Sequence, residues 1–427
     1  MNYIALSIPI FFLLIGLEWF LARRRGVDVY RFNDAVTDLG CGIGQQVTAI
    51  FFKGALFAGY VVVFERYALA RYDEGSLLPW AIAFVGVDFL YYWWHRASHE
   101  VSMLWAVHIV HHQSEDYNLA VALRQAWLSG VTSWAFYLPL AILGVPPLVF
   151  AATLSLSTLY QFWIHTRLIG RLGPLELVLN TPSHHRVHHG RNARYLDKNY
   201  AATLIVWDRL FGTFEAEAEE PRYGVVSPYA SWNSVWANVD FWGHLVEKCR
   251  RMPGVANKVR VWLMPPGWEP VGCEASSHRA PSDEPAVRYT TTLPSGVTAY
   301  VLVQFIPVVA VTSALMIVPP GSASPRHWIA ALLVLATTLA WGALFERKRW
   351  AVPLELVRLA ACATLAAAAW SVGEVAGAPA LGIALFAAGS AVWAASLSPR
   401  RRGEPDTDLS DSGPTGELPD GMLRETR

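Results

Sequence analysis

The stretch that decides the fold is DFLYYWWHRASHE, residues Asp88–Glu100, in which an apolar segment ends in two histidines four residues apart. It completes the run Leu77–Trp94, whose one charged residue is Asp88. As a helix, a run of this length can cross the roughly 30 Å hydrocarbon core of a bilayer. Residues four apart share a helix face. The stretch therefore predicts a membrane helix that presents His95 and His99 together at its end.

Similar apolar runs recur along the chain, which is 53% hydrophobic and only 16% charged. A soluble protein carries about a quarter charged residues. The run Trp127–Ile164 is too long for one crossing and has Pro146-Pro147 where a reversal is needed. The other runs are Met1–Ala22, Gln46–Phe64, Gly296–Pro319, Trp328–Phe345, Trp350–Trp370 and Ala378–Leu397. We expect an all-α polytopic membrane protein with about nine transmembrane helices.

Basic residues beside these runs predict the orientation. Arg23-Arg24-Arg25 follow the first run, whereas basic residues precede the apolar core of a cleaved signal peptide, so we expect a retained first helix. The positive-inside rule places these arginines, Arg347-Lys348-Arg349 and the histidine-bearing segments in the cytoplasm. We expect an integral multi-pass protein of a bacterial inner membrane or the endoplasmic reticulum, with its site on the cytoplasmic face.

Composition divides the chain into five parts. We expect a first transmembrane helix and basic loop (1–30), a helical region with most of the histidines (31–214), a cytoplasmic segment and linker (215–294), a C-terminal block of about four membrane helices (295–397) and a tail (398–427). The tail is charged and poor in aromatic residues, which predicts disorder.

Several function classes are excluded by what the sequence lacks. The formal net charge is zero, so we expect no nucleic-acid partner. The four cysteines show no C-x-x-C spacing and predict neither a disulfide framework nor a cysteine metal site. No G-x-G-x-x-G or P-loop motif indicates a dinucleotide or ATP.

Ten of the 13 histidines lie between His95 and His189, in three groups and a singleton. After the first pair come VHIVHHQ, the lone His165 and SHHRVHHG. Solvation explains one interfacial histidine, but not two H-x-x-H-H motifs and a pair on one membrane face. Neutral imidazole binds zinc, copper, iron or nickel, and four ligands complete a structural zinc site. So many imidazoles predict a dinuclear metal centre.

A metal centre at the mouth of a membrane bundle is placed to meet a lipid. Oxidising an unactivated C–H bond requires the reduction of O2, which redox-silent zinc cannot perform and two irons can. We expect a non-haem di-iron monooxygenase or desaturase, with O2 as co-substrate.

The spacing H-x-x-x-H, H-x-x-H-H, H-x-x-H-H resembles the fatty acid hydroxylase/sterol desaturase superfamily. SEDYN with LRQ, NTPSHHRVHHGRN and DKNY resemble its branch that cleaves glycerol ether lipids with tetrahydrobiopterin. The resemblance covers roughly residues 31–244 and makes 31–214 a fatty acid hydroxylase-like region. It implies two iron ions held by His95, His99, His108, His111, His112, His185, His188 and His189, with His165 at an additional position and His184 left open.

Asp88 is a further candidate, because it lies seven residues before His95 and shares its helix face about two turns deeper. An acid at membrane depth is costly and usually functional. We expect it to accept the second N–H of a ligand histidine and so fix the tautomer. An ion pair with Arg96 or Arg124 is the alternative.

Three polar residues near the histidines are candidates for other contacts. Glu100 is a candidate for contact with the pterin or with a metal ligand, and its alternative is a solvated interfacial carboxylate. Asn118 and Arg124 follow the second histidine group and are candidates to bind the substrate's head group or to brace the loop.

These features predict a membrane-bound monooxygenase that hydroxylates a lipid, and the resemblance implies an O-alkylglycerol. Oxidation of the carbon next to the ether oxygen gives a hemiacetal, which collapses to a fatty aldehyde and a glycerol derivative. Electrons come from a reduced pterin or a separate donor protein. A sterol, hopanoid, carotenoid or fatty acyl hydroxylase or desaturase is the alternative. From another class, a metal-binding transporter is opposed by the position at one face, because transporter sites generally lie near mid-membrane.

Overall fold

The computed structural model describes residues 3–270, 288–319, 322–373 and 375–397. The regular secondary structure of these residues is helical, as predicted, apart from one isolated β-bridge between Leu179 and Leu204. The helices are α1 (Tyr3–Arg24), α2 (Phe32–Tyr67), α3 (Leu77–Glu100), α4 (Ser102–His112), α5 (Ser129–Ile142), α6 (Pro147–Trp163), α7 (Pro182–His188), α8 (Val206–Phe211), α9 (Ser234–Ala237), α10 (Asp240–Arg251), α11 (Gly254–Leu263), α12 (Val297–Met316), α13 (Pro325–Phe345), α14 (Ala351–Ser371) and α15 (Gly377–Ser396), with 3-10 turns η1 (Val121–Leu123) and η2 (Gly173–Leu177). The expected disordered tail lies outside the described residues.

Seven of the helices in the described part of the chain are long and apolar enough to cross a membrane: α1, α2, α3, α12, α13, α14 and α15. They fit a multi-pass membrane protein, but the prediction of nine spans is not confirmed. The run 127–164 forms two shorter helices that reverse at Pro146, with Pro147 at the first position of α6. The 14 residues of α5 rise only about 21 Å, less than the hydrocarbon thickness.

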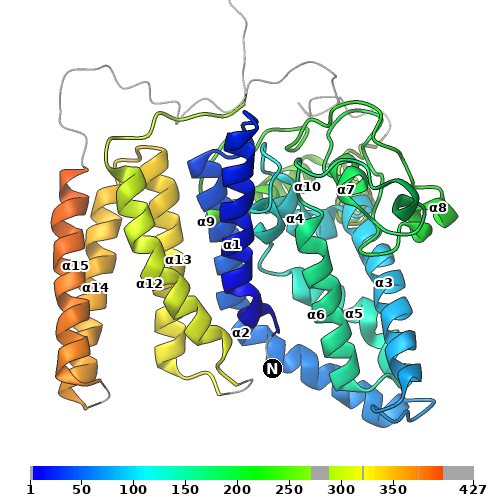
Figure 1. Cartoon of the computed structure of the whole chain (residues 1–427), viewed down its shortest axis with the longest axis horizontal. Helices are drawn as coiled ribbons and strands as arrows, with labels where there is room; N and C mark the ends of the chain where they lie inside the picture. The colour runs from blue at the N-terminus through cyan, green and yellow to red at the C-terminus, as the bar shows by residue number, and fades with distance from the viewer. Residues whose placement is uncertain (1–2, 271–287, 320–321, 374, 398–427) are drawn as a thin grey trace, which may run out of the picture. The chain divides into compact units, whose positions relative to one another are not determined.

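The C-terminal block packs against the N-terminal helices. In Figure 1, α12 to α15 lie side by side, and α12 and α13 contact α2. A buried cluster joins Tyr300 of α12 and Trp341 of α13 to Val47 of α2. Residues 295–397 therefore belong to one compact unit with the chain before them.

The histidine-bearing segments gather at one end of this helical unit. Figure 1 shows α4 and α7 beside the upper ends of α3 and α6, and α1 ends on the same side. Glu18 links α1 to the segments that follow α4 and α6, because its carboxylate accepts hydrogen bonds from Leu119 N (2.8 Å) and Thr166 Oγ1 (2.5 Å). Thr166 follows His165, so Glu18 lies level with the histidines.

Two glycines let α2 approach the segment that supports the site. A Cβ at Gly42 would lie 2.2 Å from the carbonyl oxygen of Leu123, and one at Gly44 would lie 2.3 Å from Nε1 of Trp127. Both separations are too short for any larger residue. The absence of side chains at these positions therefore seats residues 123–127 directly on α2.

Candidate metal centre

Nine histidines converge in two adjacent groups. The His95 group contains His95, His99, His108, His112 and His188, and the His165 group contains His111, His165, His185 and His189. Within each group, one ligand nitrogen per residue lies within 4.8 Å of all the others. The rings of His112 and His189, one from each group, have centroids 4.4 Å apart. The structure therefore brings together every histidine predicted as a ligand.

Each H-x-x-H-H motif contributes to both groups. On α4, His108 and His112 are one turn apart and enter the His95 group, whereas His111 enters the His165 group. The motif on α7 divides in the same way, since His188 enters the first group while His185 and His189 enter the second. Adjacent positions on a helix point in different directions. The two adjacent histidines at the end of each motif, His111-His112 and His188-His189, therefore enter different groups.

The ring nitrogens are spaced as ligands of a common ion would be. Nε2 of His108 lies 2.9 Å from Nε2 of His95 and 3.2 Å from that of His112. In the other group, Nε2 of His165 lies 3.2 Å from His111 Nε2 and 3.0 Å from His185 Nε2. Imidazole nitrogens about 2.1 Å from one ion lie about 3 Å apart when their bonds to it are perpendicular. The donor set fits one metal ion per group.

Unpaired nitrogens point to the same conclusion. Among the described residues, Nε2 of His99, His188 and His189 is buried without a hydrogen-bond partner. Leaving a buried polar atom unpaired costs about 1–3 kcal/mol, and most such atoms in proteins have partners. A metal ion would satisfy these nitrogens.

Backbone carbonyls fix the tautomers. The Nδ1–H groups donate from His95 to Tyr200 O (2.7 Å), His111 to Arg124 O (2.9 Å), His165 to Gln161 O (2.7 Å) and His188 to Lys198 O (2.9 Å). The Nε2 lone pairs then face the group centres. Burial lowers the pKa of His111 to about 4 and that of His188 to about 3, which keeps both imidazoles in the neutral form that binds metal.

The predicted role of Asp88 is wrong. Its carboxylate accepts hydrogen bonds from Thr203 N (2.8 Å), Leu204 N (3.0 Å) and Trp207 Nε1 (2.9 Å), not from a histidine. Its alternative partners, Arg96 and Arg124, pair with Glu100 and Asp38 instead. Asp88 on α3 therefore holds residues 203–207. These residues follow Tyr200, whose backbone carbonyl accepts a hydrogen bond from His95. Asp88 supports a candidate ligand through this segment and not by direct contact.

Asp208 was missed by the sequence reasoning and serves the same segment. Its two carboxylate oxygens accept hydrogen bonds from the backbone N–H groups of Tyr200 and Ala201, each at 2.8 Å. Burial raises the pKa of Asp208 to about 6. The stretch WDRLFGTF has no metal-ligand spacing, so the sequence offered no signal for this contact.

Glu100 and Asn118 occupy different environments. Glu100 lies at the end of α3, its side chain 44% exposed, and its Oε1 is 2.9 Å from Arg96 Nε. This geometry matches a solvated interfacial carboxylate and leaves a pterin contact as a prediction. Asn118 is only 1% exposed. Its Nδ2 donates to Val29 O (2.6 Å) and its Oδ1 accepts from Ala120 N (2.9 Å), and both contacts brace the loop.

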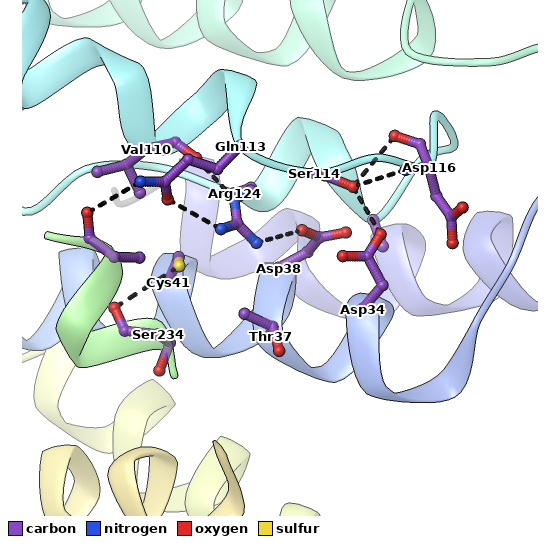
Figure 2. A network of polar contacts seen from close by, with 12 residues as sticks. Asp34, Thr37, Asp38, Cys41, Val110, Gln113, Ser114, Asp116, Arg124 and Ser234 are labelled. Carbon is purple, nitrogen blue, oxygen red and sulfur yellow. Dashed lines mark hydrogen bonds and ion pairs between the residues drawn. The ribbon is translucent and has the colours of Figure 1, made fainter. Parts of the chain in front are cut away.

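Arg124 also braces the site and does not present its charge to a head group. Figure 2 shows its guanidinium between α2 and α4, where it donates to Asp38 Oδ1 (3.0 Å), Val110 O (2.6 Å) and Gln113 Oε1 (3.0 Å). Arg124 and Asp38 are both fully buried. Because the Arg124 carbonyl accepts the Nδ1–H of His111, this network positions a candidate ligand.

His184, left open by the sequence, lies in neither group. Its Nε2 is 3.9 Å from Glu176 Oε2. The backbone carbonyl of the same residue accepts a hydrogen bond from Asn199 Nδ2 (3.1 Å). His184 therefore lies on the face of α7 turned away from the two groups.

A largely apolar cavity of about 340 Å³ reaches the two groups, and His108, His111 and His165 form part of its wall. Pockets of roughly 300–1,000 Å³ are typical for small-molecule ligands. A ligand in this cavity would touch candidate metal ligands from both groups.

Residues 80–213 match the fatty acid hydroxylase family. The chain is 45% identical over 283 residues to the alkylglycerol monooxygenase of Homo sapiens and 42% identical over 283 residues to that of Xenopus tropicalis. Both alignments cover 63% of this chain and 60% of the relative, so the chain spans about three fifths of the length of these relatives. The alkylglycerol monooxygenase of Caenorhabditis elegans is 33% identical over 333 residues, covering 73% of this chain and 66% of the relative.

No solved structure matches the chain. All nine grouped histidines lie between residues 80 and 213. The chain thus carries a fatty acid hydroxylase domain, and the two histidine groups are built inside it.

Proposed function

We propose that this chain is a membrane-bound monooxygenase that hydroxylates a lipid at a di-iron centre. The observation that carries the proposal is the pair of adjacent, buried histidine groups inside the fatty acid hydroxylase domain. One iron ion would be held by the His95 group and one by the His165 group. Iron, unlike zinc, supplies the redox chemistry that reduces O2.

The protein's own residues hold the ligands ready and exclude water. Backbone carbonyls of Tyr200, Arg124, Gln161 and Lys198 keep the ligand histidines in the tautomer that leaves Nε2 free. Burial of the groups keeps the site dry, and the cavity brings a lipid to His108, His111 and His165. The arginines 23–25 at the same end of α1 favour a cytoplasmic site under the positive-inside rule.

The substrate we propose is an O-alkylglycerol, in line with the names of the relatives. The lipid, O2, two electrons and two protons give the hydroxylated lipid and water. The new hydroxyl group stands on the carbon next to the ether oxygen, so the hemiacetal breaks its C–O bond to give a fatty aldehyde and a glycerol derivative. The electrons come from tetrahydrobiopterin or a separate donor protein. The exposed Glu100, paired with Arg96, is the proposed pterin contact.

The test is a product assay on the purified full-length chain with 1-O-hexadecylglycerol, with and without tetrahydrobiopterin. We expect hexadecanal that depends on O2 and is stimulated by the pterin. Turnover of a sterol or fatty acyl substrate without any aldehyde would overturn the ether-lipid assignment. Bound iron that does not respond to O2 would favour a metal-binding transporter.

A further inference from the structure

The cavity that reaches the histidines is walled in part by the C-terminal block. Five residues of α12 line it: Phe305, Val309, Thr312, Ser313 and Met316. Their spacing of four, seven, eight and eleven residues from the first places them on one helix face. Phe305 also meets Phe12 of α1, with ring centroids 5.8 Å apart and the rings nearly perpendicular. Helix α12 lies outside the matched segment 80–213, so this wall does not belong to the domain that holds the histidines.

Two parts of the cavity wall differ in polarity. Gln161 and Gln125 line the cavity near the histidines. The backbone carbonyl of Gln161 accepts a hydrogen bond from His165. Gln125 follows Arg124, and the backbone carbonyl of Arg124 accepts a hydrogen bond from His111. The wall formed by the first half of α1 is apolar, with Ile4, Ile8, Phe11 and Phe12, and α12 adds Thr312 and Ser313 to its own apolar residues. The cavity is therefore amphipathic, with polar groups beside the candidate metal ligands.

The depth of the cavity follows from α1. Glu18 lies level with the histidines, because it accepts a hydrogen bond from Thr166, the residue after His165. Ile4, which lines the cavity, is 14 residues earlier on the same helix and so about 21 Å further along its axis. One leaflet of a bilayer is about 15 Å of hydrocarbon. The cavity can therefore hold a long single alkyl chain over its whole length.

We propose that the lipid binds with its polar head at the glutamine and histidine end, and that its alkyl chain extends between α1 and α12. Contacts with α12 then determine which alkyl chain lengths bind. This assignment rests on the proposed function and deepens it: a carbon next to the head group lies at the histidines, whereas carbons in the middle of the chain lie beside α12. The C-terminal block thereby becomes a specificity element.

Val309→Phe tests the proposal, because it adds an aromatic ring inside the cavity. Its matched control is Ile306→Phe on the same helix, where the side chain is 72% exposed. Binding of 1-O-hexadecylglycerol and 1-O-decylglycerol is measured on the full-length, iron-loaded protein in nanodiscs, without O2 or reductant. We expect Val309→Phe to weaken hexadecylglycerol binding by about tenfold and to leave decylglycerol within about twofold. Ile306→Phe should change neither.

Equal weakening of both lipids by Val309→Phe, or no change in either, would overturn the role of α12. If Val309→Phe does not yield folded protein, the smaller change Ser313→Leu makes the same test with the same two lipids. The outcomes for the proposed function remain separate. Chain-length-dependent binding without aldehyde production would overturn the ether-lipid reaction and leave the cavity assignment standing. Aldehyde production with a chain-length profile unchanged by Val309→Phe would overturn the cavity assignment and leave the ether-lipid reaction standing.

Discussion

Two of the buried polar clusters among the described residues differ in how their polar atoms are paired. In the C-terminal block, Arg358 donates to Glu355 (2.8 Å) and Gln304 (2.9 Å), Gln304 donates to Ser390 (2.7 Å), and Tyr300 donates to Glu355. These side chains satisfy one another across α12, α14 and α15. In the histidine groups, by contrast, the Nε2 atoms of His99, His188 and His189 are buried without a hydrogen-bond partner among the described residues.

The difference separates a structural cluster from a binding site. Buried polar groups at membrane depth are costly and must find partners. The Glu355–Arg358 cluster finds its partners within the protein and ties three helices together. In the histidine groups, backbone carbonyls accept from Nδ1 of His95, His111, His165 and His188, and the Nε2 atoms of these rings face the group centres. A metal ion would complete this arrangement.

The largest effect is expected from removing a ligand. His188→Ala should abolish turnover and lower the bound iron, because His188 contributes to the His95 group while its Nδ1 is held by Lys198 O. Metal analysis and aldehyde production measure the two effects. The control His327→Ala removes a histidine that caps α13 and should change neither. Full activity in His188→Ala would refute the ligand assignment.

The next effect concerns the C-terminal cluster. Arg358→Met leaves Glu355 buried without its charge partner and should destabilise the fold by about 3–5 kcal/mol, seen as a lower midpoint of thermal unfolding in detergent. The double change Glu355→Leu with Arg358→Met should recover most of that loss. Iron per folded chain should stay unchanged in both variants. Iron loss in Arg358→Met without a change in stability would place this cluster in the metal site and end the contrast.

A smaller effect is expected at Arg124. Arg124→Lys keeps the charge near Asp38 but cannot reach Val110 O and Gln113 together (Figure 2). The backbone carbonyl of residue 124, which accepts from His111 Nδ1, is then held less firmly. Supporting contacts of this kind contribute about 10–100-fold to metal affinity. Competition with a chelator measures the change in iron affinity. Arg71→Lys, in an exposed ion pair with Glu65, serves as the control, and equal iron affinities in the two variants would contradict the positioning role.

The smallest effect is expected at Asp88. Asp88→Asn keeps the side chain's shape but weakens three hydrogen bonds to residues 203–207, which should cost about 1–3 kcal/mol of stability. Iron content should remain near that of the unaltered chain, since the hydrogen-bond partners of Asp88 in the described part of the chain are not histidines. Thermal unfolding and metal analysis are compared on the same preparations. A loss of iron with unchanged stability would restore the direct contact that the sequence suggested.

More of the histidine site than of the fold could be predicted from the sequence. The spacing of the histidines predicted a shared metal site, because i, i+3 and i+4 positions define a helix face, and the resemblance to the superfamily supplied the ligand set, including the isolated His165. The spacing could not assign His111 and His112 to different groups, since that depends on α7 meeting α4 in space. Helical geometry correctly placed Asp88 on a buried position, but its partner Thr203 lies 115 residues later.

The prediction of nine membrane spans stays unconfirmed, because hydropathy does not measure depth in the membrane. The run 127–164 is apolar throughout, yet its reversal at Pro146 leaves α5 with 14 residues and α6 with 17. Both helices gain their environment from neighbours, since α5 packs on α2 and α3 and α6 packs on α3. Length and apolarity predicted helices here, and only packing could show where they end.

The measurement that tests the central claim most directly is the metal content of the purified full-length chain, determined by mass spectrometry after aerobic purification without added metal. The two histidine groups predict two iron ions per chain, falling to about one when His165→Ala opens only one group, since each group offers a full set of ligands. A single ion per chain, or zinc in place of iron, would contradict the di-iron centre.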